Sequence, residues 1–421
     1  MTEVANAWLE EKDIPRDSFF ADRMLARKRF LDLGIPTSRH EEWRFTALRA
    51  RINPAASFTS IPSLTDKQCP TIGLSGLTLH WHNGRFSSMN ESLPVGAAFY
   101  SFEVAQSRPD IKQYLQSVDT MSDNALWQLN QATSSEGWVL HLTKDMAFDC
   151  IINMVHTADG LSESDWVNTR LVVVTESEKS VFFREFFNEL GAGIYNHAAS
   201  FFVASNARLI HAAIRNQAGT ARLITQQETQ IQANGQFYST SFFTGGDFTR
   251  NTAHACLMGS GAHAELNGVY TPAASQLTDN HILIDHRVPD CTSSQLFKGI
   301  LQDQSTAVFN GKIFVKPDAQ RTRAYQSSKA VLISDSCTIH AKPQLEIFAD
   351  DVKCSHGAAI GQLNDQEIFY LRARGIDPQT ARAMILNAFV QDVVSAHPDE
   401  EIQAFFHTYL AQLFLPMGYD E

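Results

Sequence analysis

A cysteine and a histidine lie two positions apart in the stretch DDVKCSHGAA, where Cys354 and His356 precede Gly357. If this stretch is a β-strand, side-chain alternation places both residues on one face, about 7 Å apart. A thiolate and an imidazole at that distance could bind a soft metal ion, or a sulfide-bridged cluster with further ligands from elsewhere. They could also act as a nucleophile and its base. The alternative is structural, with Cys354 as a small buried residue and His356 capping a turn, and the spacing alone favours this alternative.

Other histidines form less suggestive patterns, because none of their spacings matches a known zinc motif. The pairs are His254 with His263, and His281 with His286 on either side of Asp285. His80 and His82 alternate on a strand that enters an Asn-Gly turn, and we interpret them as surface residues. The chain contains neither a Walker-type nor a dinucleotide-binding glycine motif, so any nucleotide energy must come from a partner.

Composition excludes several classes of protein. The six cysteines are widely spaced and form no C-x-x-C pair, which argues against a zinc ribbon or a self-contained ferredoxin cluster and favours a reducing compartment. With 34 basic and 46 acidic residues, the net charge of −12 argues against nucleic acid or an anionic membrane surface as a partner. No apolar stretch reaches the roughly 18 residues of a membrane span. The acidic N-terminus does not resemble a signal peptide, so we expect a cytoplasmic location.

The period of the apolar residues divides the chain into three regions. Residues 1–140 are predicted to be mainly helical, with a β-hairpin at Asn83-Gly84. Residues 141–362 contain short β-type runs with no convincing helix between them. Glycine-containing pairs between these runs are interpreted as turns: Asn234-Gly235, Gly245-Gly246, Asn267-Gly268 and Asn310-Gly311. A β-solenoid fits such a series best, since each short strand can stack on the next coil, and a sandwich or a large barrel is the alternative.

Residues 363–421 are predicted to form a C-terminal helical region. Asn364 and Glu367 have the spacing of a capping box, and Pro378 can begin a second helix. That helix carries apolar residues at helical spacing, among them Ala381, Met384, Ile385 and Phe389. A unit of this size is small for an independent core, so we expect it to pack on the β region or on another protein.

Four stretches of the chain resemble the SufB/SufD family of iron–sulfur cluster assembly proteins. They are Pro36–Leu48 (PTSRHEEWRFTAL), Ala307–Lys312 (AVFNGK), Tyr325–Ser334 (YQSSKAVLIS) and Lys342–Ile376, which holds Lys-Cys-Ser-His-Gly. Within this family the chain is similar to the SufD branch, because SufB usually has His-Glu-Ala where Cys354, Ser355 and His356 stand here. Total length agrees as well, so the resemblance covers nearly the whole chain.

The resemblance implies a mainly β fold, a right-handed parallel β-helix flanked by N-terminal and C-terminal helical domains. It also implies a non-catalytic scaffold subunit that pairs with SufB through the β-helix. The C-terminal helices would bind the ABC-type ATPase SufC, with Pro378, Ala381, Met384, Ile385 and Phe389 as candidate contacts. Sulfur would arrive from a cysteine desulfurase system.

The resemblance places a transient iron–sulfur cluster at the SufB–SufD interface, with no cofactor bound permanently by this chain alone. His356 is then a candidate cluster or iron ligand that faces SufB, and Cys354 is its neighbour. A flavin has also been proposed for the assembled scaffold of this family.

Two other classes of protein were considered. β-Solenoids also serve as carbohydrate lyases and hydrolases, but those enzymes are usually secreted and carry clustered aspartates, which this chain lacks. A standalone metal-binding protein is disfavoured because Cys354 and His356 alone cannot complete a coordination sphere.

Overall fold

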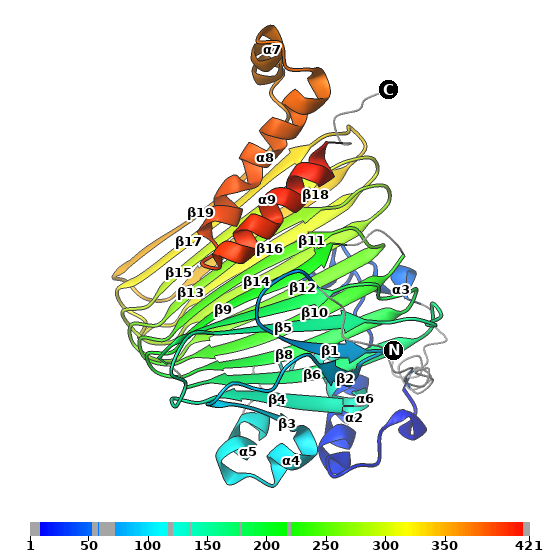
Figure 1. Cartoon of the computed structure of the whole chain (residues 1–421), viewed down its shortest axis with the longest axis vertical. Helices are drawn as coiled ribbons and strands as arrows, with labels where there is room; N and C mark the ends of the chain where they lie inside the picture. Colours follow the sequence, from blue (N-terminus) through cyan, green and yellow to red (C-terminus); the bar gives the residue numbers. More distant parts are fainter. Residues whose placement is uncertain are drawn as a thin grey trace.

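Two long β-sheets face each other along most of the chain (Figure 1). The computed structural model describes residues 9–52, 58, 72–116, 121–134, 136–176, 178–216 and 220–415. From β4 onward, even-numbered strands belong to a nine-stranded sheet and odd-numbered strands to a ten-stranded sheet. Each coil of the chain therefore contributes one strand to each sheet. The result is a β-solenoid of about 8 turns between residues 136 and 362, which confirms the predicted fold class.

The solenoid strands of the nine-stranded sheet are β4 (Glu136–Leu142), β6 (Trp166–Thr175), β8 (Ile194–Val203), β10 (Arg222–Ile231), β12 (Phe248–Leu257), β14 (Leu277–His286), β16 (Thr306–Val315) and β18 (Thr338–Ile347). Those of the ten-stranded sheet are β5 (Cys150–Thr157), β7 (Ser180–Phe187), β9 (Arg208–Asn216), β11 (Gln236–Thr244), β13 (His263–Thr271), β15 (Thr292–Leu301), β17 (Thr322–Leu332) and β19 (Val352–Gln362). Within each sheet, these solenoid strands all pair with one another in parallel. Alternate side chains of both sheets point inward and form the central core.

Some of the predicted turns connect strands and others lie inside them. Asn234 has a φ of 56° between β10 and β11, and both glycines of Gly245-Gly246 have positive φ between β11 and β12. Asn267-Gly268 and Asn310-Gly311, in contrast, lie within β13 and β16, so these two turn predictions were wrong. Gly268 has a packing role instead, because a Cβ there would lie 2.4 Å from the ring of Phe297.

The N-terminal region adds strands and helices to the first coils. Asn83 and Gly84 form the predicted hairpin turn, with φ of 49° and 77°, between antiparallel strands β1 (Leu77–His82) and β2 (Arg85–Met89). Strand β1 also pairs in parallel with β5, and β3 (Ala97–Ser101) pairs antiparallel with β4. His80 and His82 are fully buried, contrary to prediction, because β5 and its Thr157 hydroxyl cover them.

The N-terminal helices lie against the outer face of the nine-stranded sheet, where they cover apolar side chains of β4, β6, β8, β10, β12, β14 and β16. They are α2 (Phe20–Leu33), α3 (Leu48–Arg51), α4 (Phe102–Gln106), α5 (Pro109–Gln116) and α6 (Ala125–Thr133), with short 3-10 helices at Glu11–Asp13 and Glu41–Trp43.

The C-terminal helices are α7 (Asp365–Ala373), α8 (Pro378–Ala396) and α9 (Glu400–Phe414). Helices α8 and α9 lie on the outer face of the ten-stranded sheet, whereas α7 projects beyond the last coil (Figure 1). Caps define their starts, since Asn364, Asp377 and Asp399 each accept hydrogen bonds from backbone amides of the first turn. None of the described helices has the length and apolar character that crossing a membrane would require.

Candidate functional site

The solenoid ends in an open coil formed by β18 and β19. Each of these strands has a single sheet neighbour, β16 and β17 respectively, so one backbone edge of each faces outward. His356 and Cys354 lie on β19, opposite Gln326 and Ala324 of β17. Because parallel in-register neighbours point to the same side of a sheet, both residues belong to the inward-facing rows.

His356 continues a polar row that is buried in the preceding coils. Gln326 is 4% exposed and donates a hydrogen bond to Gln295, its neighbour in the row. His356 occupies the next position, yet it is exposed because no further coil covers it. The imidazole is therefore presented at the open end of the solenoid interior.

Cys354 lies one step along the same strand and is half-buried. Its side chain packs against a small apolar cluster that includes Ile313, Val315 and Ala324. Burial raises the pKa of the Cys354 thiol, so the thiol is protonated at neutral pH. This environment does not favour a nucleophilic thiolate, and a metal ion bound here would have to displace the proton.

The surface around the open coil is unusually apolar for an exposed strand edge. Tyr325, Phe348 and Ile360 are 49%, 59% and 51% exposed. Gly357 and Gly361 of β19 leave open space, since a Cβ at either position would meet no described atom within 4 Å. An uncovered strand edge with apolar neighbours is a template for pairing with another chain.

A groove separates α7 from α8 beside the end of β19. It encloses about 520 Å³, and its apolar lining includes Leu363, Leu371, Met384, Ile385 and Phe389. Two other candidate contacts predicted from the sequence lie elsewhere on α8: Pro378 is exposed at the first helical position, and Ala381 is fully buried. Ala381 is therefore not available for a partner.

A buried ion-pair network holds these helices on the solenoid. The Arg184 guanidinium of β7 donates to Asp399 through Nε at 2.6 Å and Nη2 at 2.9 Å. Its Nη2 also lies 2.9 Å from a Glu401 carboxylate oxygen. Arg184 and Asp399 have side chains only 1% and 4% exposed. The network thus connects the solenoid to the chain between α8 and α9 and to the first turn of α9.

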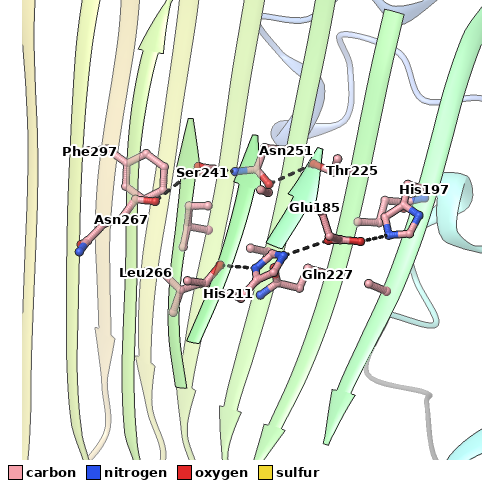
Figure 2. A pocket seen from close by; sticks show the side chains of 16 residues that line it. Glu185, His197, His211, Thr225, Gln227, Ser241, Asn251, Leu266, Asn267 and Phe297 are labelled. Atoms are coloured by element: carbon pink, nitrogen blue, oxygen red, sulfur yellow. Dashed lines mark hydrogen bonds and ion pairs between the residues drawn. The ribbon is translucent and has the colours of Figure 1, made fainter. Parts of the chain in front are cut away.

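A second group of polar side chains, which the sequence analysis missed, lies inside the solenoid. The Glu185 carboxylate of β7 lies between His197 and His211 (Figure 2), with His156 near the same carboxylate oxygen as His197. The coils that bring these residues together differ in length, so no fixed sequence interval links them. Only an assignment of the inward-facing positions on successive strands could have brought these residues together from the sequence.

His254 has spatial neighbours that differ from the partner suggested by its spacing in the sequence. His254 lies 3.4 Å from the Cys256 sulfur and close to Asp285, rather than beside His263. Arg287 Nε lies 2.6 Å from Asp285 Oδ2, so this carboxylate oxygen has a cationic partner without a metal ion.

Comparison with known proteins assigns the chain to a family. A profile described as "SUF system FeS cluster assembly, SufBD core domain" matches residues 156–389, and one described as "SufBD protein N-terminal region" matches residues 13–154. The chain belongs to the SufBD family. The core match spans the solenoid from the end of β5 onward and most of α8, so the open coil, His356 and the groove all lie within the matched residues.

Several individual proteins are similar to this chain over most of their length. The chain is 28% identical to the iron–sulfur cluster assembly protein SufD of Escherichia coli, over 89% of this chain and 88% of the relative. It is 28% identical to the chloroplastic protein ABCI7 of Arabidopsis thaliana, over 87% and 80% of the two chains. A SufBD family protein of Synechocystis is 27% identical over 88% and 86%. The chain is thus a SufD-like protein of SUF-system iron–sulfur cluster assembly, a family of generally non-catalytic scaffolds.

Proposed function

We propose that this chain is the SufD-type scaffold subunit of a SufBCD complex and that it pairs with SufB through the open end of its solenoid. The observation that carries the proposal is the exposed coil with two unpaired strand edges, on which His356 and Cys354 lie side by side. Free backbone groups along β18 and β19 can hydrogen-bond to the strands of a second solenoid. The open space at Gly357 and Gly361 allows a close approach of the partner backbone.

A nascent iron–sulfur cluster would form where the two subunits meet. His356 would supply an imidazole ligand, and Cys354 is a second candidate whose thiol must first lose its proton. A cluster requires more ligands than these two, so the remainder would come from SufB. The iron and sulfide are substrates of this assembly, and the sulfide would be delivered by a cysteine desulfurase system.

The groove between α7 and α8 would receive the SufC ATPase. Its lining is apolar at Met384, Ile385 and Phe389, and α7 beside it exposes Phe369 and Tyr370 at 71% and 56%. Exposed apolar surface of this kind favours a protein partner. ATP hydrolysis would then occur on SufC, while this chain transmits the movement of its C-terminal helices.

The groove between α7 and α8 does not suit a flavin, because its lining contains no lysine or arginine to bind a phosphate. The proposal therefore assigns no flavin to this groove. The proposal also includes a division of the chain into three domains, at residues 1–140, 141–362 and 363–421. It further includes a cytoplasmic location.

Substitution at the open coil tests the proposed pairing. Ile360→Asp places a charge among exposed apolar residues of β19, and Val95→Asp is the matched control because Val95 is 83% exposed and lies outside the open coil. Each variant would be co-expressed with SufB and SufC from the same organism and its complexes weighed by native mass spectrometry. We expect Ile360→Asp to lose SufB while remaining folded, and Val95→Asp to retain it. A complete complex with Ile360→Asp would refute pairing through this end.

A further inference from the structure

Three side chains from three coils converge inside the solenoid, about the middle of its first half. His156 projects inward from β5, Glu185 from β7 and His197 from β8 of the opposite sheet. All three are at most 3% exposed. One donor atom from each lies within 4.8 Å of the others. Both sheets therefore contribute to one buried point.

The distances between the donor atoms suit a shared ion. Glu185 Oε1 lies 3.0 Å from His197 Nε2 and 3.8 Å from His156 Nε2. Ligands about 2.1 Å from a metal are separated by about 3 Å at right angles and by about 4.2 Å when opposite. None of these three atoms forms a hydrogen bond of acceptable geometry within the described part of the chain, although His197 approaches closely. Three buried polar atoms thus lie close together without hydrogen-bonding to one another. Burial of such atoms lowers the stability of the fold unless an ion or a water molecule binds between them.

The Nδ1 atoms of His156 and His197 each have a hydroxyl partner. His156 Nδ1 lies 2.9 Å from the Tyr195 hydroxyl, and His197 Nδ1 lies 2.8 Å from the Thr169 hydroxyl. When Nδ1 carries the proton and donates it to such an oxygen, Nε2 is left with a lone pair that can bind a metal. Metal-ligating histidines generally have an outer partner of this kind.

The negative charge of the buried Glu185 carboxylate also favours a bound cation. The ion-pair partners of Glu185 among the described residues are histidines: His156, His197 and His211. A fully buried carboxylate without a nearby cation is strongly unfavourable, so the carboxyl group is protonated, an imidazole is protonated or a cation is bound. His211 Nε2 donates to the second carboxylate oxygen at 2.9 Å, which orients Oε1 toward the other two histidines.

Space for a further ligand lies next to the cluster. The interior cavity of about 20 Å³ is bounded by Glu185, His197 and His211 and otherwise by a mixture of polar and apolar side chains, including Gln227 and Leu266 (Figure 2). One water molecule needs about 10–15 Å³ of such volume. Two imidazoles, one carboxylate and a water form a donor set typical of ferrous and zinc sites.

We propose that His156, Glu185 and His197 bind one divalent first-row transition-metal ion, Fe²⁺ or Zn²⁺, inside the solenoid. This site is separate from the open coil and does not depend on SufB. It would place a metal ion within the scaffold chain itself, with His211 as a positioning residue.

The test measures metal binding by the full-length chain alone. Purified protein carrying His356→Ala, which removes the exposed imidazole, would be freed of metal, incubated anaerobically with Co²⁺ or Fe²⁺ and gel-filtered. Metal content and the visible absorption of bound Co²⁺ would then be recorded. We expect one ion per chain, a higher midpoint of thermal unfolding with metal than without, and loss of both effects in Glu185→Gln. His286→Gln is the control, since His286 is equally buried but lies outside the cluster.

Thr169→Val provides a second variant if Glu185→Gln does not fold. It removes the hydroxyl partner of His197 with little change of volume, and we expect about 10- to 100-fold weaker metal binding. Undiminished binding in either folded variant, or no metal uptake by the parent chain, would overturn the proposal. In the latter case a proton within the cluster, rather than a metal ion, neutralises the buried charge.

Discussion

Removing the Asp399 carboxylate should release the C-terminal helices from the solenoid. Asp399 accepts two hydrogen bonds from the buried Arg184 guanidinium and also caps α9 through the amides of Glu401 and Ile402. Asp399→Ala therefore breaks an ion pair and a helix cap with one substitution. Since α8 forms one wall of the groove, the change also bears on the proposed binding of the ATPase.

The expected cost follows from the burial of the pair. Leaving a buried charge without its partner costs about 3–5 kcal/mol, and loss of the cap adds about 1 kcal/mol. Glu401 stays 2.9 Å from Arg184 and compensates part of the charge. We therefore expect the free energy of opening of α8 and α9 to fall by about 3–5 kcal/mol.

Hydrogen exchange followed by mass spectrometry measures this opening directly. At about 1.4 kcal/mol per factor of ten, amides in residues 378–414 should exchange about a hundredfold to a few thousandfold faster in Asp399→Ala. The matched control is Gln412→Ala, because Gln412 is an exposed residue of α9 and truncation of such a surface side chain should change stability by no more than about 0.5 kcal/mol. If the two variants exchange alike, the network does not hold the helices and the reasoning is refuted.

Three further outcomes are expected. Gly357→Val should leave the isolated chain as stable as wild type, because a Cβ at this position meets open space. The same substitution should weaken SufB pairing at least tenfold in a pull-down assay. Unchanged pairing would contradict a close approach of the SufB backbone at Gly357. Met384→Asp, in the groove, should reduce SufC association measured by calorimetry, whereas Ser395→Asp, exposed at the far end of α8, should not. Although burial alone would raise it, Arg250 keeps the pKa of Asp279 below its usual range. The stability from this carboxylate is thus present above about pH 4 and lost as pH falls toward the lowered pKa. Asp279→Asn should flatten that part of an acid-unfolding curve, and an unchanged curve would show that Asp279 does not contribute.

The fold was predictable because its signals are local. Short β-type runs, turn glycines and the absence of helices all follow from neighbouring residues, and they indicated a solenoid. Strand lengths were not predictable in the same way. The run Leu171–Val174 is part of a ten-residue strand, Trp166–Thr175, whose polar Asn168 and Thr169 are buried. Hydrogen bonds from other coils reach the Asn168 side-chain oxygen and the Thr169 hydroxyl, and Asn130 of α6 donates to the Thr169 carbonyl. Sequence periodicity does not reveal these contacts.

The candidate site was predictable only in part, for the same reason. Cys354 and His356 are close in sequence, so strand alternation placed them on one face. His156, Glu185 and His197 come together only through the coil register, and coil length varies: Arg222 lies beside Phe248, but Thr306 lies beside Thr338. The burial of His80 and His82 likewise depends on β5, which lies about seventy residues further along the chain.

The central claim is that the open coil of this chain supplies a cluster ligand to an interface with SufB. The most direct measurement is the iron and acid-labile sulfide content of the co-expressed complex after anaerobic reconstitution, with wild type, His356→Ala and Cys354→Ser compared at equal complex mass. Because His356 is exposed and contributes little to packing, the account predicts that His356→Ala leaves the complex intact and lowers both iron and sulfide. Cys354→Ser should have a milder effect if Cys354 acts mainly in packing. Wild-type iron and sulfide in the His356→Ala complex would contradict the account and leave His356 without a role as a ligand.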